Sequence, residues 1–418
     1  MTNSQSLRLA VLATTCLVVP SLASAQQQPT ERDIERQKLE QPGPFDPLGI
    51  RSGSFFFFPK IELAGNYDDN VFATSGNEED DFFFTASPRI DVKSNLSRHA
   101  VNFTIGAEFG LYDEFTDNNY QDFDVGVDAA LDISRSDLLK SKLAFARKHE
   151  DRDSPDDFGA DEPIVYYEFG PDISYRHDFN RIFTVASIKA VRLEFEDTNV
   201  SNEDDRDRYE IVPGLRLGYQ LSPRFSPFIQ GNYVITKYDQ TPDDANENRD
   251  GTGYSVRAGT TIDFTRLLVG ELSAGYVFRE YDDNNLDDVK GFGGGGTLTW
   301  TPTQLTTVNF RAVGEVQETT VTFQGDPASA DFAKTIGVDL THELRRNLFL
   351  KGGASYTRDD FEGTDRSDNS VRANVGLTYQ ITRNFGIDAT YEFTDRTSDD
   401  DNEEFTRNIF RIGVTARL

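Results

Sequence analysis

The sequence predicts an all-β fold, a transmembrane antiparallel up-and-down β-barrel of about 18 strands within a range of roughly 16 to 18. The prediction rests on three features of the chain: an export signal at the N-terminus, apolar residues at every second position, and connections that alternate between short turns and long acidic loops. Together these features are typical of an outer-membrane protein rather than a soluble enzyme.

The N-terminus has the layout of a secretory signal peptide. Arg8 precedes an apolar run over residues 9–19, and a small-x-small site at residues 23–25 follows. We therefore expect residues 1–25 to be a signal peptide. The apolar run is too short to span a bilayer, so a retained membrane helix is the weaker interpretation.

The rest of the chain divides into a short polar segment and a long barrel region. Residues 26–53 are polar and contain prolines, which predicts a flexible periplasmic segment; the alternative is that they enter the lumen or meet a periplasmic partner. Residues 54–418 carry the barrel pattern. The only cysteine, Cys16, lies within the predicted signal peptide, so no disulfide is expected in the exported protein.

The formal net charge of -29 and the low mean hydropathy argue against a helical membrane protein. They are compatible with a barrel, because only every second residue of a spanning strand faces lipid. No nucleic-acid partner is expected.

Alternation with a period of two residues is the strand signal in this chain. It is clearest in residues 101–111, 123–133, 211–219 and 371–379. A period of two places successive side chains on opposite faces of a strand. These segments reach the ~9 to 11 residues that a tilted spanning strand needs, whereas the strands of a soluble sandwich or propeller, the alternative fold, are shorter and alternate less strictly.

Two kinds of connection separate the strand segments. Short turns recur at residues 175–181, 221–225, 264–267, 301–304, 344–347 and 381–385. Long acidic connections cover residues 77–81, 150–157, 203–207, 241–250, 281–288, 357–370 and 395–404. Short periplasmic turns and long outer loops are typical of outer-membrane barrels, and counting roughly nine long and eight short connections gives about 18 strands.

If one face of each strand meets lipid, the other lines the lumen. A charge on the lipid face would cost a few kcal/mol near the midplane, so the charged positions are predicted to face inward. The predicted pore-lining residues are Glu168, Arg192, Arg216, Arg257, Glu271, Arg311, Glu315, Lys351, Arg372, Asp388, Glu392 and Arg411. Inward glycines such as Gly218 and Gly259 are expected to leave space open. A barrel of this size encloses an aqueous channel unless something plugs it, and residues 26–53 are too few for a plug domain.

The chain shows no catalytic, cofactor or metal motif. The four histidines fall at short turns or a loop base, so none lies mid-barrel beside a serine. We therefore expect no enzymatic activity and no cofactor. The acidic loops could bind Ca²⁺ or bridge to lipopolysaccharide through divalent ions, but solvated, self-repelling loops are the preferred interpretation.

The last residues, 410–418, form an apolar ladder that ends at Leu418. This is the pattern of a closing strand recognised by the barrel assembly machinery, although the usual terminal aromatic residue is missing. Outer-membrane lipid and lipopolysaccharide are the other expected partners.

The opening of the barrel region resembles a known family. Residues 45–55, FDPLGIRSGSF, followed by residues 67–72, YDDNVF, are similar to the start of the family called putative β-barrel porin 2. The resemblance implies a large barrel in the outer membrane, and several members are linked to exopolysaccharide or capsule export alongside a periplasmic polysaccharide export protein. It carries over no site residues.

Three functions therefore stay open. We expect a passive conduit, with a secreted polysaccharide as its hypothesised substrate. The first alternative is a general or solute-specific diffusion porin. The second is a structural or adhesive barrel whose loops do the work.

Overall fold

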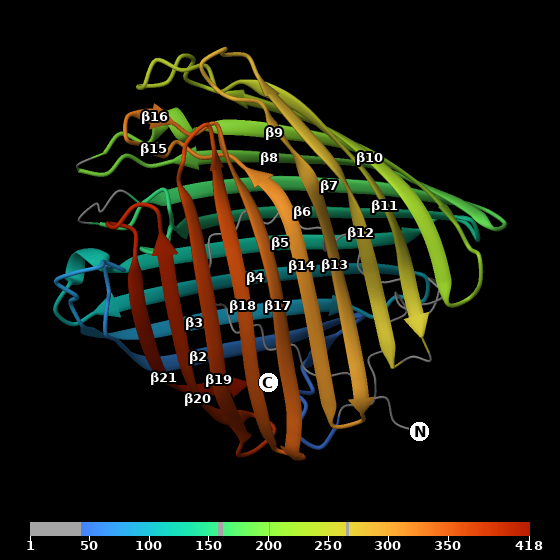
Figure 1. Cartoon of the computed structure of the whole chain (residues 1–418). Coiled ribbons are helices and arrows are strands. Elements are labelled where there is room, and N and C mark those ends of the chain that lie inside the picture. Colours follow the sequence, from blue (N-terminus) through green and yellow to red (C-terminus); the bar gives the residue numbers. More distant parts are fainter. Residues whose placement is uncertain (1–42, 158–161, 200, 265–266) are drawn as a thin grey trace.

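The computed structural model describes residues 43–157, 162–199, 201–264 and 267–418. In this part of the chain, eighteen long strands form one closed antiparallel barrel (Figure 1). The predicted fold class and the predicted number of strands are confirmed. The signal peptide and residues 26–42 of the predicted periplasmic segment lie outside the described residues.

The barrel strands are 12 to 16 residues long. Each pairs with its neighbours in chain order, and β21 pairs with β2 to close the barrel. Because about 9 to 11 residues suffice to cross the membrane, the strands extend beyond it. The strands are β2 (Phe55–Asp68), β3 (Asp81–Ser94), β4 (His99–Tyr112), β5 (Tyr120–Asp132), β6 (Asp137–His149), β7 (Val165–Phe179), β8 (Ile182–Phe195), β9 (Arg208–Tyr219), β10 (Phe225–Tyr238), β11 (Gly251–Phe264), β12 (Leu268–Tyr281), β13 (Val289–Thr303), β14 (Thr306–Gln317), β17 (Ala330–Arg345), β18 (Leu348–Glu362), β19 (Ser367–Gln380), β20 (Phe385–Ser398) and β21 (Phe405–Arg417).

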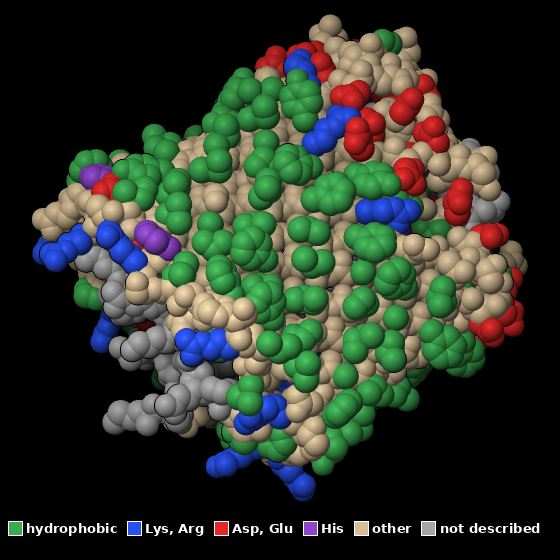
Figure 2. Space-filling view, turned by 180° about the vertical axis from the view of Figure 1, so that it is seen from behind, with side chains coloured by type: hydrophobic (Ala, Val, Ile, Leu, Met, Phe, Trp, Pro, Cys, Tyr) green, Lys and Arg blue, Asp and Glu red, His purple; other side chains and the backbone are tan. Residues whose placement is uncertain are grey.

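The alternation in the sequence becomes an apolar outer surface and a polar inner one. In β4, Ile105 is 53% exposed on the outside, whereas its neighbour Gly106 is buried on the inner face. Figure 2 shows the result: apolar side chains cover the middle of the outer surface, acidic residues gather at one end and basic residues at the other. An apolar belt between two polar ends is the surface that a bilayer requires.

The connections alternate between short and long as predicted, but several are partly strand, such as residues 175–179 in β7 and 395–398 in β20. The expected long loop over residues 357–370 is mostly strand, because β18 continues to Glu362 and β19 begins at Ser367. Acidic residues are tolerated in this strand pair where cations neutralise them, as Lys334 Nζ does at 2.6 Å from an Asp360 carboxylate oxygen. The prediction treated every acidic run as a loop and was wrong here.

The loops contain little regular structure. In the loop of residues 318–329, β15 (Thr322–Phe323) and β16 (Asp326–Pro327) form a small hairpin. Single 3₁₀ turns occur at η2 (Thr116–Asn118) and η3 (Asp204–Arg206). Among the described residues, no helix is long and apolar enough to cross a membrane.

The described part of the N-terminal segment is ordered against the barrel. β1 (Ile50–Ser52) pairs with residues 55–57 of β2, on the edge that β21 leaves free below residue 60. Arg417 donates a hydrogen bond to the Phe45 carbonyl at 3.0 Å, and Arg383 donates one to the Gly43 carbonyl at 3.3 Å. The expectation of a flexible segment is therefore wrong for β1, because an open strand edge offers backbone partners to the passing chain.

Buried apolar side chains concentrate at the end of the barrel that carries the long loops. One cluster joins Tyr281, Leu286, Val289 and Ala330, and another joins Val321, Ala328 and Phe361. A water-filled lumen needs no such packing, so the loops themselves must fold together over the outer mouth.

Candidate functional site

Eleven of the twelve predicted pore-lining residues lie on the inner face of the wall. Each alternates with an outward apolar neighbour in its strand, as Arg216 does between Leu215 and Leu217, which are 60% and 55% exposed. The eleven are Glu168, Arg216, Arg257, Glu271, Arg311, Glu315, Lys351, Arg372, Asp388, Glu392 and Arg411.

Arg192 is the exception, and its prediction is corrected here. It pairs across the sheet with Phe169 and Tyr209, both of which are exposed on the outer surface, and its guanidinium Nη2 lies 2.6 Å from Asp239. The reason is local. At this end of β8 the apolar Leu193 faces inward and is 1% exposed, because it packs beneath the loops rather than against lipid.

About half of the inward charges are neutralised within the wall or by a loop. Arg216 Nη1 lies 2.9 Å from the Glu271 carboxylate, and the same guanidinium donates to the Gln230 side chain. Lys148 Nζ lies 2.9 Å from Glu168. Arg411 forms an ion pair with Glu62 and lies 3.8 Å from Asp388. Such pairing fixes the inner side chains in place.

The other inward charges have no protein partner. Within the described part of the chain, no hydrogen bond or ion pair is made by Arg257, Arg311, Glu315, Lys351 or Glu392. Lys189, which the sequence analysis did not select, also faces inward, opposite Asp172 on β7. Arg257 and Glu315 are buried, at 9% and 6% exposed, whereas Arg311, Lys351 and Glu392 are at least partly exposed. These three offer charges of both signs to solutes and water in the lumen.

The inward glycines do not leave the expected open space. A Cβ at Gly218 would lie 2.0 Å from the Phe183 ring, and one at Gly259 would lie 2.5 Å from the Phe228 ring. Arg176 lies over the first ring at 4.0 Å and Arg216 over the second at 3.9 Å. The glycines admit aromatic rings flat against the wall, where guanidinium groups cover them.

Residues 150–157, hereafter the crossing loop, reach the far side of the barrel. The crossing loop follows β6, in the connection to β7. Around the barrel, five strands lie between β6 and β20, and nine strands lie between β7 and β19. Even so, Asp153 accepts from Arg372 of β19 at 2.5 Å, and its backbone carbonyl accepts from Arg396 of β20. The loop therefore lies across the lumen rather than over the outer surface.

Further contacts hold the crossing loop to the loops around it. The Asp156 carboxylate accepts from the Thr319 hydroxyl at 2.6 Å, in the loop between β14 and β17. Arg152 Nε donates to the Asn118 side chain at 2.9 Å. These contacts come from several sides of the barrel, so the loop is anchored around the mouth.

The most buried anchor is an ion triad. Arg206 lies 2.9 Å from Glu150 of the crossing loop and 2.8 Å from Glu203, and all three side chains are at most 7% exposed. The guanidinium also lies over the Phe195 ring at 4.1 Å. Buried charges of this kind are tolerated only when they are paired, so the triad ties the base of the crossing loop to its neighbour.

Asp151 of the crossing loop is an incompletely hydrogen-bonded carboxyl group. Its side chain is 20% exposed, and one of its oxygens has no hydrogen-bond partner. Burial raises the pKa of this carboxyl to about 7, and the neighbouring Asp153 carboxylate adds to the effect, while His149, Arg407 and Arg372 oppose it. Asp151 therefore holds its proton to a higher pH than an ordinary aspartate does.

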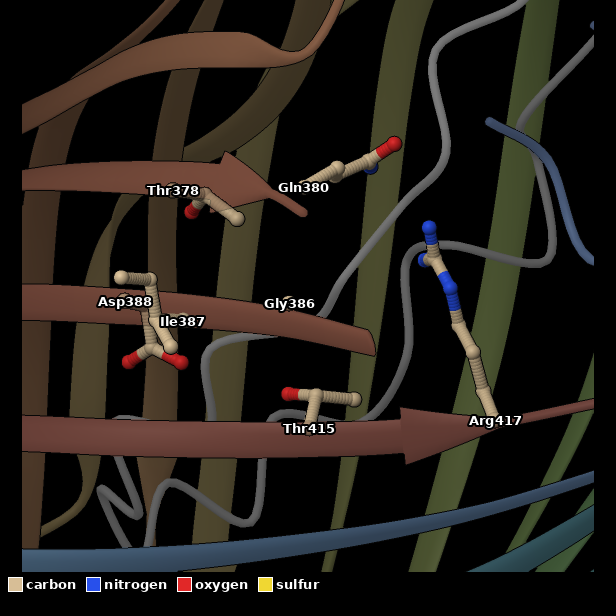
Figure 3. A pocket seen from close by; sticks show the side chains of 7 residues that line it. All are labelled: Thr378, Gln380, Gly386, Ile387, Asp388, Thr415 and Arg417. Carbon is tan, nitrogen blue, oxygen red and sulfur yellow. The ribbon is translucent and has the colours of Figure 1, made fainter. Parts of the chain in front are cut away.

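The inner wall has a recess at its periplasmic end. Figure 3 shows a recess in this end of the wall, with the Arg417 side chain extending away from its strand. Its lining residues are Thr378 and Gln380 of β19, Gly386, Ile387 and Asp388 of β20, and Thr415 and Arg417 of β21. Since Arg417 also holds the Phe45 carbonyl, residues 43–46 lie beside this recess.

The sequence analysis missed the residues that shape the mouth. Asp153 and Arg206 showed no signal because loops lack periodicity. Arg396 was assigned to a long loop although it lies in β20, because residues 394–402 are all polar and show no alternation. In the described ranges, no three His, Cys, Asp or Glu side chains converge as metal ligands.

Comparison with known families agrees with this geometry. The family model described as "Putative beta-barrel porin 2" matches residues 43–418. The chain belongs to this family. The porin-like barrel is accordingly a protein of the outer membrane, and the predicted family and location are confirmed. A sequence search of the curated proteins finds no match.

Solved outer-membrane barrels are among the structures that this chain resembles. They include OccAB4 of Acinetobacter baumannii, 13% identical with a TM-score of 0.44, where the match covers 90% of this chain and 100% of that one. OpdK of Pseudomonas aeruginosa, solved with vanillate, is 12% identical with a TM-score of 0.42 and coverage of 87% and 98%. The copper transporter OprC is 10% identical with a TM-score of 0.49 and coverage of 89% and 82%.

Proposed function

We propose that this protein is a passive, non-enzymatic channel for small polar solutes, and that the crossing loop limits the size of what passes. The observation that carries the proposal is the position of Asp153, which is bound to the opposite wall of the barrel. A loop held across the lumen narrows it at that height. Below the loop, the unpaired inward charges offer a polar path.

Polysaccharide export, the function first expected, has less support. Neither the family description nor the names of the three solved barrels above mention polysaccharide. An extended sugar polymer would also have to displace the crossing loop with its ion pairs to Arg372 and Arg206. The diffusion porin, first of the two alternatives, therefore fits the geometry better.

The test is single-channel conductance of the refolded protein in a planar bilayer, with graded polyethylene glycols to size the pore. The wild-type protein should conduct and exclude all but the small polymers. Asp153→Ala should raise conductance and admit larger ones, because the loop loses its anchor on β19. The matched control is Asp287→Ala, an exposed acidic residue in another outer loop.

Two outcomes would contradict the proposal. A channel that stays silent in both the wild type and Asp153→Ala would favour a structural or adhesive barrel. A wild-type pore that already admits large polymers would show that the crossing loop limits nothing.

A further inference from the structure

The wall that holds the crossing loop has the chemistry of an anion site. Thr394 of β20 pairs with Arg372 of β19 on one side and with Arg407 of β21 on the other. The two arginines therefore lie at the same height on strands either side of β20. Arg396 lies two residues further along β20, on the same inner face. Three guanidinium groups are thus gathered on one patch of the inner wall.

The inner wall neutralises only some of these three guanidinium groups. Arg407 is held by Asp68, whose carboxylate accepts from Nε at 2.9 Å. Among the described residues, Arg372 has one ion-pair partner, Asp153 of the crossing loop. Arg396 is 5% exposed, its Nε has no hydrogen-bond partner, and its nearest carboxylate, that of Glu403, is 3.7 Å away.

Asp153 therefore occupies this patch as a carboxylate ligand would. Its side chain accepts from Arg372 while its carbonyl accepts from Arg396, and it is 11% exposed. If the loop swings out, Arg372 loses its ion pair with Asp153 and Arg396 loses a charge-assisted hydrogen bond to the Asp153 carbonyl. Two neighbouring guanidinium groups would then lack these acceptors, and guanidinium groups are the donors that carboxylates bind.

We propose that Arg372 and Arg396 form a binding site for small carboxylate solutes, and that Asp153 fills this site until a solute carboxylate displaces it. The inference rests on the proposed function and names a class of solute for it. Because Asp153 is tethered, it competes at an effective concentration in the mM range. A solute should therefore displace Asp153 only at mM concentrations, unless it makes a second contact with the protein.

The test compares two variants that release the same loop but should differ in affinity. The probe is succinate, with its uncharged diamide as the control ligand, and binding to the folded protein in detergent is measured by titration calorimetry. Asp153→Asn should bind succinate about tenfold or more tightly than the wild type, because the tethered competitor is gone. Arg372→Gln should lose succinate binding, although its crossing loop is equally free.

The folded state of each variant is checked by its shifted migration in unheated gels. Equal succinate affinity in Asp153→Asn and Arg372→Gln, or equal binding of succinate and the diamide, would overturn the proposal. Binding is measured without conduction, so its loss would leave the channel proposal intact. In the same way, a protein that binds succinate but never conducts would contradict only the channel.

Discussion

Asp151 should make closure of the crossing loop dependent on pH. Its pKa is about 7 with the loop in place, against 3.8 for an ordinary aspartate, because the carboxyl is buried beside Asp153. A released loop gives up this proton near pH 4, while the closed loop keeps it until about pH 7. The closed state therefore loses stability as pH rises through this window and changes little above it.

The size of the effect follows from the shift. About three pH units at ~1.36 kcal/mol each give at most about 4 kcal/mol against closure above pH 7. Between pH 5 and pH 8 the same two pKa values predict a loss of about 2.6 kcal/mol, which is a change of about 80-fold in the ratio of closed to open loops. Asp151→Asn cannot ionise and should remove this part of the response.

The assay is the open probability of single channels at pH 5 and pH 8. The wild type should open as pH rises, and Asp151→Asn should stay mostly closed at both values. Any response that persists in the variant belongs to other groups, such as His149. An unchanged response in Asp151→Asn, or a wild type that opens on acidification, would refute the reasoning.

Three further predictions test the wall and its anchors. Leu272→Arg should cost about 2 to 4 kcal/mol in urea unfolding from vesicles because the residue faces lipid, whereas Ser273→Arg, one position on and facing the lumen, should cost little. Gly218→Ala should lower the unfolding free energy by about 1 to 3 kcal/mol by forcing a ring off the wall, while Gly126→Ala, whose Cβ would meet nothing closer than 3.9 Å, should be neutral. Arg206→Met should leave two buried carboxylates unpaired, at a cost of about 3 to 5 kcal/mol to the closed mouth, and so speed proteolysis of the outer loops.

The barrel could be predicted from the sequence because lipid imposes its own pattern. Each strand must present apolar side chains at every second position, and this pattern gave both the strand number and the inner face of residues such as Arg257 and Glu315. The prediction from alternation failed where a strand does not face lipid. At the outer end of β8, Leu193 packs inward under loops, so Arg192 faces outward.

The crossing loop could not be predicted for a related reason. Its position depends on single long-range contacts, such as Asp153 with Arg372, a pair separated by more than two hundred residues of chain. Nothing in an acidic loop sequence shows whether its carboxylates meet water or a distant arginine. The candidate site was therefore predicted only in part: Arg372 was found on the inner wall, but Arg396 and the loop residue Asp153 were not.

The short strand β1 has a consequence for how the barrel closes. A strand joining a sheet edge can slip by two residues and still keep its apolar face toward lipid, so alternation alone does not fix the shear of the barrel. Here β1 occupies the edge of β2 opposite residues 55–57, and the backbone N–H of Leu418 donates to the Pro59 carbonyl. β21 therefore cannot slide toward the start of β2. The N-terminal residues act as a stop that sets the register in which the first and last strands meet.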